Sequence, residues 1–214
     1  IPLIEKIAKT KKPVILSTGM ATMQEIELAT QTLKKFGCKN FAILKCTSTY
    51  PANPRDSNII TILNMKKKFE CEVGISDHTP GIGVSVASVA LGASIIEKHI
   101  TLDKENGAVD SKFSLEPNEF KLLNNEIYRA WLSLGSKKYG PTNNEVDSLR
   151  YRRSIYVIKD LKKGEILDHS NLKIIRPSLG LHPKYFNKII GEKVNQDIQK
   201  NTPLSISHLD SNLD

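Results

Sequence analysis

Two histidines that end apolar runs are the residues of this sequence best suited to chemistry. His78 follows Ser76 and Asp77 at the end of one run, and His99 comes two residues after Glu97 at the end of the next. The parallel strands of α/β enzymes present such polar residues where they leave the buried sheet. Two neutral imidazoles from adjacent strands, with carboxylates beside them, would hold a divalent metal against a substrate oxygen. The alternative is that each histidine only caps its strand by hydrogen bonding, but two of them at matching positions favour a site.

A second candidate group follows another apolar run, where a short loop carries an ammonium group, three hydroxyls and a phenol. Such donors at a strand end suit the oxygens of a phosphate or a carboxylate. The donors are Lys45, Thr47, Ser48, Thr49 and Tyr50. A hydroxyl-rich turn closed by Pro51 explains the same residues without a ligand.

Two further polar residues stand apart from these groups. Asp110 lies in a loop after Gly107, where its carboxylate would bind sugar hydroxyls or the amide hydrogens of an acetamido group; an Asx turn is the alternative. Arg176 precedes Pro177, which favours extended backbone from which the guanidinium can project toward an anion. From the residue types alone, a structural role for Arg176 is the simpler interpretation.

The composition indicates a globular protein with an excess of positive charge. The 214 residues are 39% hydrophobic and 25% charged, and 31 Lys and Arg against 23 Asp and Glu give a net charge of +8. Because no basic run is interleaved with aromatic residues, a small anionic substrate is favoured over nucleic acid. Three cysteines without metal-binding spacing fit a reducing cytoplasm. The longest weakly polar stretch, residues 84–96, is too short and too rich in Ser and Gly to cross a membrane.

The first half of the chain repeats an apolar run followed by a helical pattern, at intervals of roughly 20–30 residues. The runs predicted to be buried parallel strands are Pro13–Ser17, Phe41–Cys46, Glu72–Ser76 and Ala93–His99. Helices are predicted from a capping box at Thr22 and Glu25 to Gly37, over Gly81–Leu91, and from Pro117 to Gly135. Four such units make half of a (β/α)₈ TIM barrel, or else a complete four-stranded open sheet. Functional-looking residues after every strand favour the half barrel.

The composition changes after this region. Residues 1–135 are predicted to be the C-terminal half of a TIM-barrel domain, and the polar residues 136–150 to be a linker. Residues 151–214 are predicted to form a small β-rich domain, with extended segments at Ile155–Ile158 and Lys173–Arg176.

Taken in order, these strings resemble the sialic acid synthase family, whose members join a (β/α)₈ barrel to a small antifreeze-like (SAF) domain. The strings that carry the resemblance are residues 12–20, 76–79, 97–99, 162–165 and 202–204. Within the family, residues 45–48, 110–114 and 176–184 resemble the branch that makes pseudaminic acid. A synthase of legionaminic or N-acetylneuraminic acid stays open.

The resemblance implies a condensation of phosphoenolpyruvate with 2,4-diacetamido-2,4,6-trideoxy-altrose to a nine-carbon acid and phosphate. It implies a divalent metal held by His78 and His99, usually Mn²⁺ with Mg²⁺ or Co²⁺ as alternatives. Glu97 would orient or deprotonate the attacking water, so the predicted catalytic residues are Glu97 and the two histidines. Ser48 and Ser76 match positions that bind phosphoenolpyruvate. The predicted substrate-binding residues are Lys45, Thr47, Ser48, Tyr50, Ser76, Asp77, Asp110 and Arg176.

The resemblance also implies an assembly, a domain-swapped homodimer in which Arg176 reaches over the partner's barrel. Tyr50 and Asp110 match positions near the sugar.

The family's first four βα units have no counterpart in these 214 residues, so we expect the complete gene product to be longer and this chain alone to be inactive. A non-catalytic carbohydrate-binding or assembly module is the alternative of another class. The intact His78, Glu97 and His99 argue against it, because decay of a catalytic site would erode them.

Overall fold

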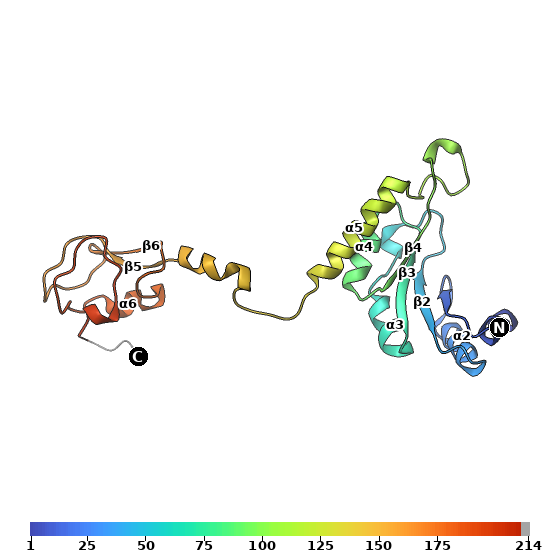
Figure 1. Ribbon diagram of the computed structural model, residues 1–214, viewed down its shortest axis with the longest axis horizontal. Helices are drawn as coiled ribbons and strands as arrows, with labels where there is room; N and C mark the ends of the chain where they lie inside the picture. The colour runs from blue at the N-terminus through green and yellow to red at the C-terminus, as the bar shows by residue number, and fades with distance from the viewer. Residues whose placement is uncertain (211–214) are drawn as a thin grey trace. The chain divides into compact units, whose positions relative to one another are not determined.

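The computed structural model describes residues 1–210, and of Asn106 only the backbone. The last four residues of the predicted C-terminal domain, 211–214, lie outside the described residues. The chain forms two compact units that divide between Ser136 and Lys137 (Figure 1). Among residues 1–210, no helix is long and apolar enough to cross a membrane.

A four-stranded parallel sheet forms the centre of the first unit. Its strands are β1 (Val14–Ser17), β2 (Phe41–Cys46), β3 (Glu72–Asp77) and β4 (Ile95–Lys98). They lie in the order β1-β2-β3-β4, and each is parallel to the next. This sequential, all-parallel order is the one expected for half of a (β/α)₈ barrel.

Helices connect the strands. They are α1 (Pro2–Lys9), α2 (Met23–Lys35), α3 (Thr61–Phe69), α4 (Gly83–Ala90) and α5 (Pro117–Ser133), with short 3₁₀ turns η1 (Pro54–Asp56) and η2 (Lys104–Asn106). The predicted capping box begins α2: the Glu25 amide donates to Thr22 Oγ1 at 3.3 Å, and the Thr22 amide donates to Glu25 Oε2 at 2.7 Å. The structure adds α1 and α3, whose bounds the sequence analysis did not assign.

The two faces of the sheet have different surroundings. On one face, which we call the helix face, Ile43, Val73 and Ile75 pack with side chains of α2, α3 and α4 in one apolar cluster. Because successive strand residues point to opposite faces, the residues between them lie on the other face, which we call the open face. Ile15 of β1 is 57% exposed there. The open face therefore receives every second residue of the strand ends, including Ser76 and Glu97.

The second unit is small and rich in turns. Its strands β5 (Ser154–Val157) and β6 (Leu172–Ile175) are antiparallel. Its other elements are η3 (Asn143–Tyr151), η4 (Pro183–Tyr185), α6 (Phe186–Ile189) and η5 (Ile206–His208). One apolar cluster that includes Ile155, Leu167 and Leu204 forms its core. The 3₁₀ helix η3 occupies part of the segment that the sequence analysis describes as a linker.

Candidate active site

The two histidines lie together where β3 and β4 end. The ring centroids of His78 and His99 are 5.1 Å apart, and the ring planes are inclined by 74°. In the register of the two strands Ser76 is paired with Glu97, and each histidine follows two residues later on the same face. The structure thus brings together the two residues that the sequence predicts as metal ligands.

Each imidazole has an oxygen beside one of its two nitrogens. Nδ1 of His78 lies 3.0 Å from the carbonyl oxygen of Thr47, and since a carbonyl only accepts, this nitrogen carries the proton. Nδ1 of His99 lies 3.6 Å from Oδ2 of Asp110. The hydrogen bond to Thr47 fixes the tautomer of His78 and leaves its Nε2 with a lone pair, which is the usual arrangement of metal-binding histidines. The Asp110 carboxylate faces the same nitrogen of His99 at ion-pair distance.

Aromatic side chains line the histidine pair. The Tyr50 ring lies 4.4 Å from the His78 ring and 6.0 Å from the His99 ring, measured between centroids. The Phe113 ring lies 5.0 Å from that of His99 and is almost fully buried. The ring centroids of Tyr50 and Phe113 are themselves 6.1 Å apart, so the four rings form one cluster with apolar surface beside the histidines, as in ligand sites with a few convergent polar groups.

A carboxylate stands beside the pair on the same face. The Ser76 hydroxyl donates to Glu97 Oε1 at 2.6 Å, across the paired residues of β3 and β4. This hydrogen bond orients the carboxylate and leaves its second oxygen to accept a proton. Glu97 is exposed, so water has access to that oxygen.

The hydroxyl-rich loop lies after β2 and lines a cavity of about 600 Å³ that Lys45, Thr47 and Ser48 share. Lys45 Nζ donates to the Cys46 carbonyl at 3.0 Å and to Thr47 Oγ1 at 3.4 Å. Burial lowers the pKa of Lys45 below its ordinary value. A Cβ at Gly19 would overlap the Ser48 hydroxyl, which would have to rotate away, so this loop packs closely on the end of β1.

The structure does not bring Asp77 to the open face. Its side chain is buried on the helix face, where it accepts hydrogen bonds from Lys98, Thr79 and Ser85. Burial raises the pKa of Asp77, but the hydrogen bonds from Ser85, Lys98 and Thr79 outweigh burial and hold the pKa below its ordinary value. None of these three partners is among the predicted site residues. The signal was available, because a residue between Ser76 and His78 must point away from both.

Arg176 belongs to the second unit, where it directly follows β6 and is exposed. The other predicted site residues all belong to the first unit.

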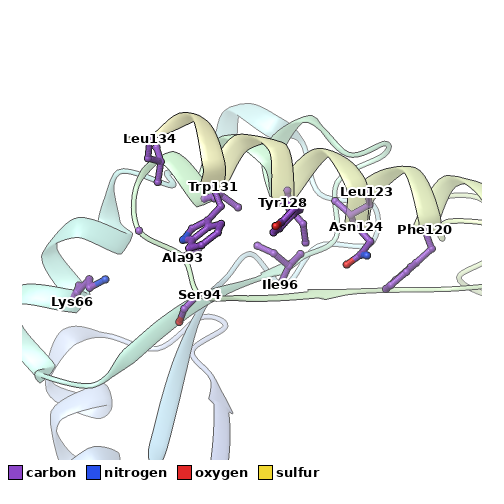
Figure 2. A pocket seen from close by; sticks show the side chains of 13 residues that line it. Lys66, Ala93, Ser94, Ile96, Phe120, Leu123, Asn124, Tyr128, Trp131 and Leu134 are labelled. Atoms are coloured by element: carbon purple, nitrogen blue, oxygen red, sulfur yellow. The ribbon is translucent and has the colours of Figure 1, made fainter. Parts of the chain in front are cut away.

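A separate apolar groove of about 570 Å³ runs along α5 in the first unit. Figure 2 shows Trp131, Tyr128 and Leu123 of α5 on one side of it and Ile96 of β4 on the other. Within the described chain, none of its lining residues is a predicted site residue.

The side chains at the open face fit a divalent metal with an incomplete set of protein ligands. Among residues 1–210, no group of three or more His, Cys, Asp and Glu side chains is arranged to hold a metal ion. His78, which is oriented through Nδ1, and His99, whose Nδ1 faces the Asp110 carboxylate, supply two nitrogen donors. Two imidazoles leave the remaining positions to water and substrate oxygens, as in catalytic metal sites that keep open positions.

Comparison with known proteins gives matches over both units. The model of the NeuB family matches residues 1–139, and the model of the SAF domain matches residues 152–210. A Campylobacter jejuni protein named pseudaminic acid synthase is 43% identical over 196 residues, covering 92% of this chain and 57% of that protein. A Campylobacter jejuni protein named N,N'-diacetyllegionaminic acid synthase is 42% identical over 195 residues, covering 90% of this chain and 58% of that protein.

A solved structure is also similar. The crystal structure of an N-acetylneuraminic acid synthetase from Leptospira borgpetersenii has a TM-score of 0.63 and 39% sequence identity. The similarity covers 71% of this chain and 53% of that one. The chain spans less than two thirds of the length of each of these three proteins.

Proposed function

Because the chain belongs to the NeuB family and continues into a SAF domain, we propose that the protein containing it is a sugar-acid synthase. The reaction proposed is the condensation of phosphoenolpyruvate with 2,4-diacetamido-2,4,6-trideoxy-altrose to pseudaminic acid and phosphate. The observation that carries this proposal is the open-face cluster, in which His78 and His99 converge beside Glu97. The net charge of +8 agrees with an anionic substrate.

The proposed metal is a divalent ion, Mn²⁺ in the first place with Mg²⁺ or Co²⁺ as alternatives. His78 and His99 would hold it through Nε2, since Nδ1 of each ring faces an oxygen. When bound there, such an ion supplies Lewis acidity that polarises the aldehyde of the open-chain sugar.

The remaining groups divide between the two substrates. Ser48, with Thr47 of the same loop and Lys45 at the end of β2, would donate to the phosphate and carboxylate of phosphoenolpyruvate. Ser76 would line the same subsite while its single hydroxyl proton stays on Glu97. Tyr50, Phe113 and Asp110 surround the histidines and would bind the sugar, with the Asp110 carboxylate accepting from hydroxyl or acetamido hydrogens.

Glu97 is proposed as the base for the attacking water. C3 of phosphoenolpyruvate forms a bond to the aldehyde carbon, and the aldehyde oxygen takes up a proton to become a hydroxyl. Water adds at C2 as Glu97 accepts one of its protons, while Ser76 holds the other end of the carboxylate. Cleavage of the bond between C2 and the phosphate ester oxygen then releases phosphate, and the added oxygen gives up its remaining proton to become the keto oxygen.

We further propose a domain-swapped homodimer in which Arg176 of one subunit reaches the barrel of the other and binds an anionic group of the substrate. Cytoplasmic localisation is also proposed. The three cysteines, all free in the structure, are compatible with a reducing compartment.

The test uses the protein expressed from its complete open reading frame and stripped of metal. It is mixed with phosphoenolpyruvate and the altrose sugar, N-acetylmannosamine or the precursor of legionaminic acid, with and without Mn²⁺. Mass spectrometry detects the nine-carbon acid, and phosphate release is followed in parallel. We expect a Mn²⁺-dependent product from the altrose sugar.

The similarity to a legionaminic acid synthase, at 42% identity, makes the sugar comparison necessary. Product from another sugar only would retain the mechanism and overturn the proposed substrate. Absence of product from all three sugars, together with absence of Mn²⁺ binding, would overturn the synthase and favour a non-catalytic carbohydrate-binding or assembly module.

A further inference from the structure

A buried ion pair lies on the helix face, directly behind the two histidines. Oδ2 of Asp77 and Nζ of Lys98 are 2.9 Å apart, and each side chain is 1% exposed. The two residues are opposite one another in the register of β3 and β4. Asp77 immediately precedes His78 and Lys98 immediately precedes His99, so the ion pair and the histidine pair occupy opposite faces of the same two strand ends.

The ion pair also fixes the turn that follows His78. Oδ1 of Asp77 accepts from the Thr79 amide at 2.8 Å and from the Thr79 hydroxyl at 2.7 Å. Lys98 donates to the Thr79 carbonyl. Oδ2 of Asp77 accepts from Ser85 Oγ in the first turn of α4 at 2.6 Å. His78 therefore lies between Asp77 and Thr79, which are hydrogen-bonded to each other and to Lys98. Asp77 is also hydrogen-bonded to Ser85 of α4.

From this arrangement we propose that Asp77 and Lys98 are positioning residues that set the separation and orientation of the two imidazoles, and thereby the affinity of the site for a divalent metal. The inference rests on the proposed function, because it takes His78 and His99 as the metal ligands. Both side chains of the ion pair are buried on the helix face, so they act through the backbone of β3 and β4 and do not contact substrate.

Stability alone is a poor reason for this ion pair. Desolvation of two buried charges costs so much that an apolar pair of similar volume often gives equal or greater stability. A hydrogen bond between charged groups has a defined direction. Here it joins Asp77 to Lys98, which are paired in the register of β3 and β4, so a shift of one strand by a residue would break it. What the pair supplies beyond stability is a fixed alignment of the two strand ends that carry the histidines.

The test measures Mn²⁺ affinity directly, by titration calorimetry or by the electron paramagnetic resonance signal of free Mn²⁺, on the protein from the complete open reading frame. The double variant Asp77→Asn with Lys98→Met removes both charges, so that neither is left buried without its partner. Ser85→Ala removes one hydrogen bond of the network and is a milder variant that keeps the ion pair. Lys68→Met, which removes a half-exposed ion pair with Glu27, is the matched control.

We expect the Kd for Mn²⁺ to rise roughly 10-fold or more in the double variant, as when groups that orient metal ligands are removed. Ser85→Ala should raise it less, and Lys68→Met should leave it unchanged. High Mn²⁺ concentrations should restore part of the lost rate, because they fill the weakened site.

Circular dichroism shows whether the double variant is folded. An unchanged Kd in the folded double variant overturns the inference and leaves the proposed function standing. If the double variant does not fold, an unchanged Kd for Mn²⁺ in Ser85→Ala overturns the inference instead and leaves the proposed function standing. A wild-type protein that binds no Mn²⁺ and forms no product overturns both.

Discussion

At the scale of single residues, the open-face site is specified by the hydrogen bond that each side chain already makes. His78 uses Nδ1 on the carbonyl of Thr47, and Glu97 uses Oε1 to accept from Ser76. In each case one atom has no hydrogen-bond partner among residues 1–210, Nε2 of the imidazole or the second oxygen of the carboxylate. A substitution can therefore remove the chemistry of that atom while it keeps the hydrogen bond.

Glu97→Gln is such a substitution. The glutamine oxygen still accepts from Ser76, but the side chain no longer takes a proton from water. We expect kcat to fall about 10²–10⁴-fold, the usual contribution of a positioned general base. The Kd for Mn²⁺ should stay within about twofold of the wild-type value, because the histidines are untouched. Steady-state kinetics and a Mn²⁺ titration on the same protein provide both numbers.

Two control variants separate the role of Glu97 from that of the metal ligands. Ser76→Ala keeps the Glu97 carboxylate but removes the hydrogen bond that orients it, and should lower kcat less than Glu97→Gln. His78→Ala should abolish both Mn²⁺ binding and product formation. A kcat unchanged by Glu97→Gln would show that the base lies elsewhere.

The second unit contains a residue that makes stability depend on pH. The Ser205 amide donates to Nδ1 of His208 at 3.2 Å at the start of η5, and burial lowers the pKa of His208 below its ordinary value of 6.5. The folded state thus favours the neutral ring, which is the form that can accept. The stability that this provides is complete above pH 6.5 and is lost as the pH falls through the lowered pKa.

His208→Gln removes this titration and keeps an acceptor at the same capping-box position. We expect the Tm of the wild-type protein to fall further between pH 7.5 and pH 5 than the Tm of the variant. Thermal unfolding of both proteins in matched buffers measures this difference. The other titrating groups are common to both proteins, so their contributions cancel in the comparison. Equal slopes, or a smaller fall in the wild type, would contradict this assignment.

At the scale of elements, the sequence predicts the first unit well because its strands are buried and its helices have end signals. The predicted strand Phe41–Cys46 is β2 itself, and the other three predicted strands differ from the observed ones by one or two residues at their ends. The capping box at Thr22 begins α2, and Pro117 is the first residue of α5. The matches to the NeuB family and the SAF domain confirm the predicted fold class and the predicted family.

Which face a residue occupies was harder to predict than which element it belongs to. Asp77 was predicted to bind substrate, and the structure buries it with Lys98 on the helix face. The residue types alone suggested a polar cluster, whereas the two-residue period of a strand separates Asp77 from His78. Contacts that join distant loops, such as Thr47 with His78, also depend on tertiary packing that no local pattern encodes.

Gly74 is needed for the close approach of β3 to β4. A Cβ at this position would overlap the carbonyl oxygen of Ile95, which is backbone and cannot rotate away. Gly74→Ala should therefore separate the two strands and destabilise the protein by about 1–3 kcal/mol or more. Gly83→Ala in α4 is the matched control, because within the described chain nothing lies within 4 Å of a Cβ there. It should be neutral or stabilise by about 0.4–1 kcal/mol, as urea unfolding would measure. Equal stabilities of the two variants would refute the close approach.

Lys98→Met should be far more costly than removal of an exposed lysine. It leaves the Asp77 carboxylate buried without its cation, for which we expect a loss of about 3–5 kcal/mol in the free energy of unfolding. Lys68→Met breaks an ion pair with Glu27 whose side chains are 41% and 37% exposed, and should cost no more than about 1 kcal/mol. Denaturant unfolding of the two variants side by side tests the difference. Similar losses would contradict the expectation that the Asp77 carboxylate is left buried without a compensating partner.

At the scale of the whole molecule, the groups of the proposed reaction are divided between the two units. The histidines and Glu97 belong to the first unit, and Arg176 belongs to the second. The NeuB match falls mainly on the first unit, and the SAF match falls on the second. If the reaction needs both units, an experiment must show whether the Arg176 of each site comes from the same subunit as the histidines or from the other subunit.

The proposed homodimer predicts that two inactive variants restore each other's activity. In that dimer each site combines the histidines of one subunit with Arg176 of the other. When His78→Ala and Arg176→Ala proteins are co-expressed, about half of the dimers are mixed, and one of the two sites in each mixed dimer is intact. We expect the mixture to recover about a quarter of the wild-type activity, although each variant alone is nearly inactive. His78→Ala with His99→Ala should stay inactive, because both changes fall in the same half of the site. Recovery by this control pair, or no recovery by the first pair, would contradict the exchange of Arg176 between subunits.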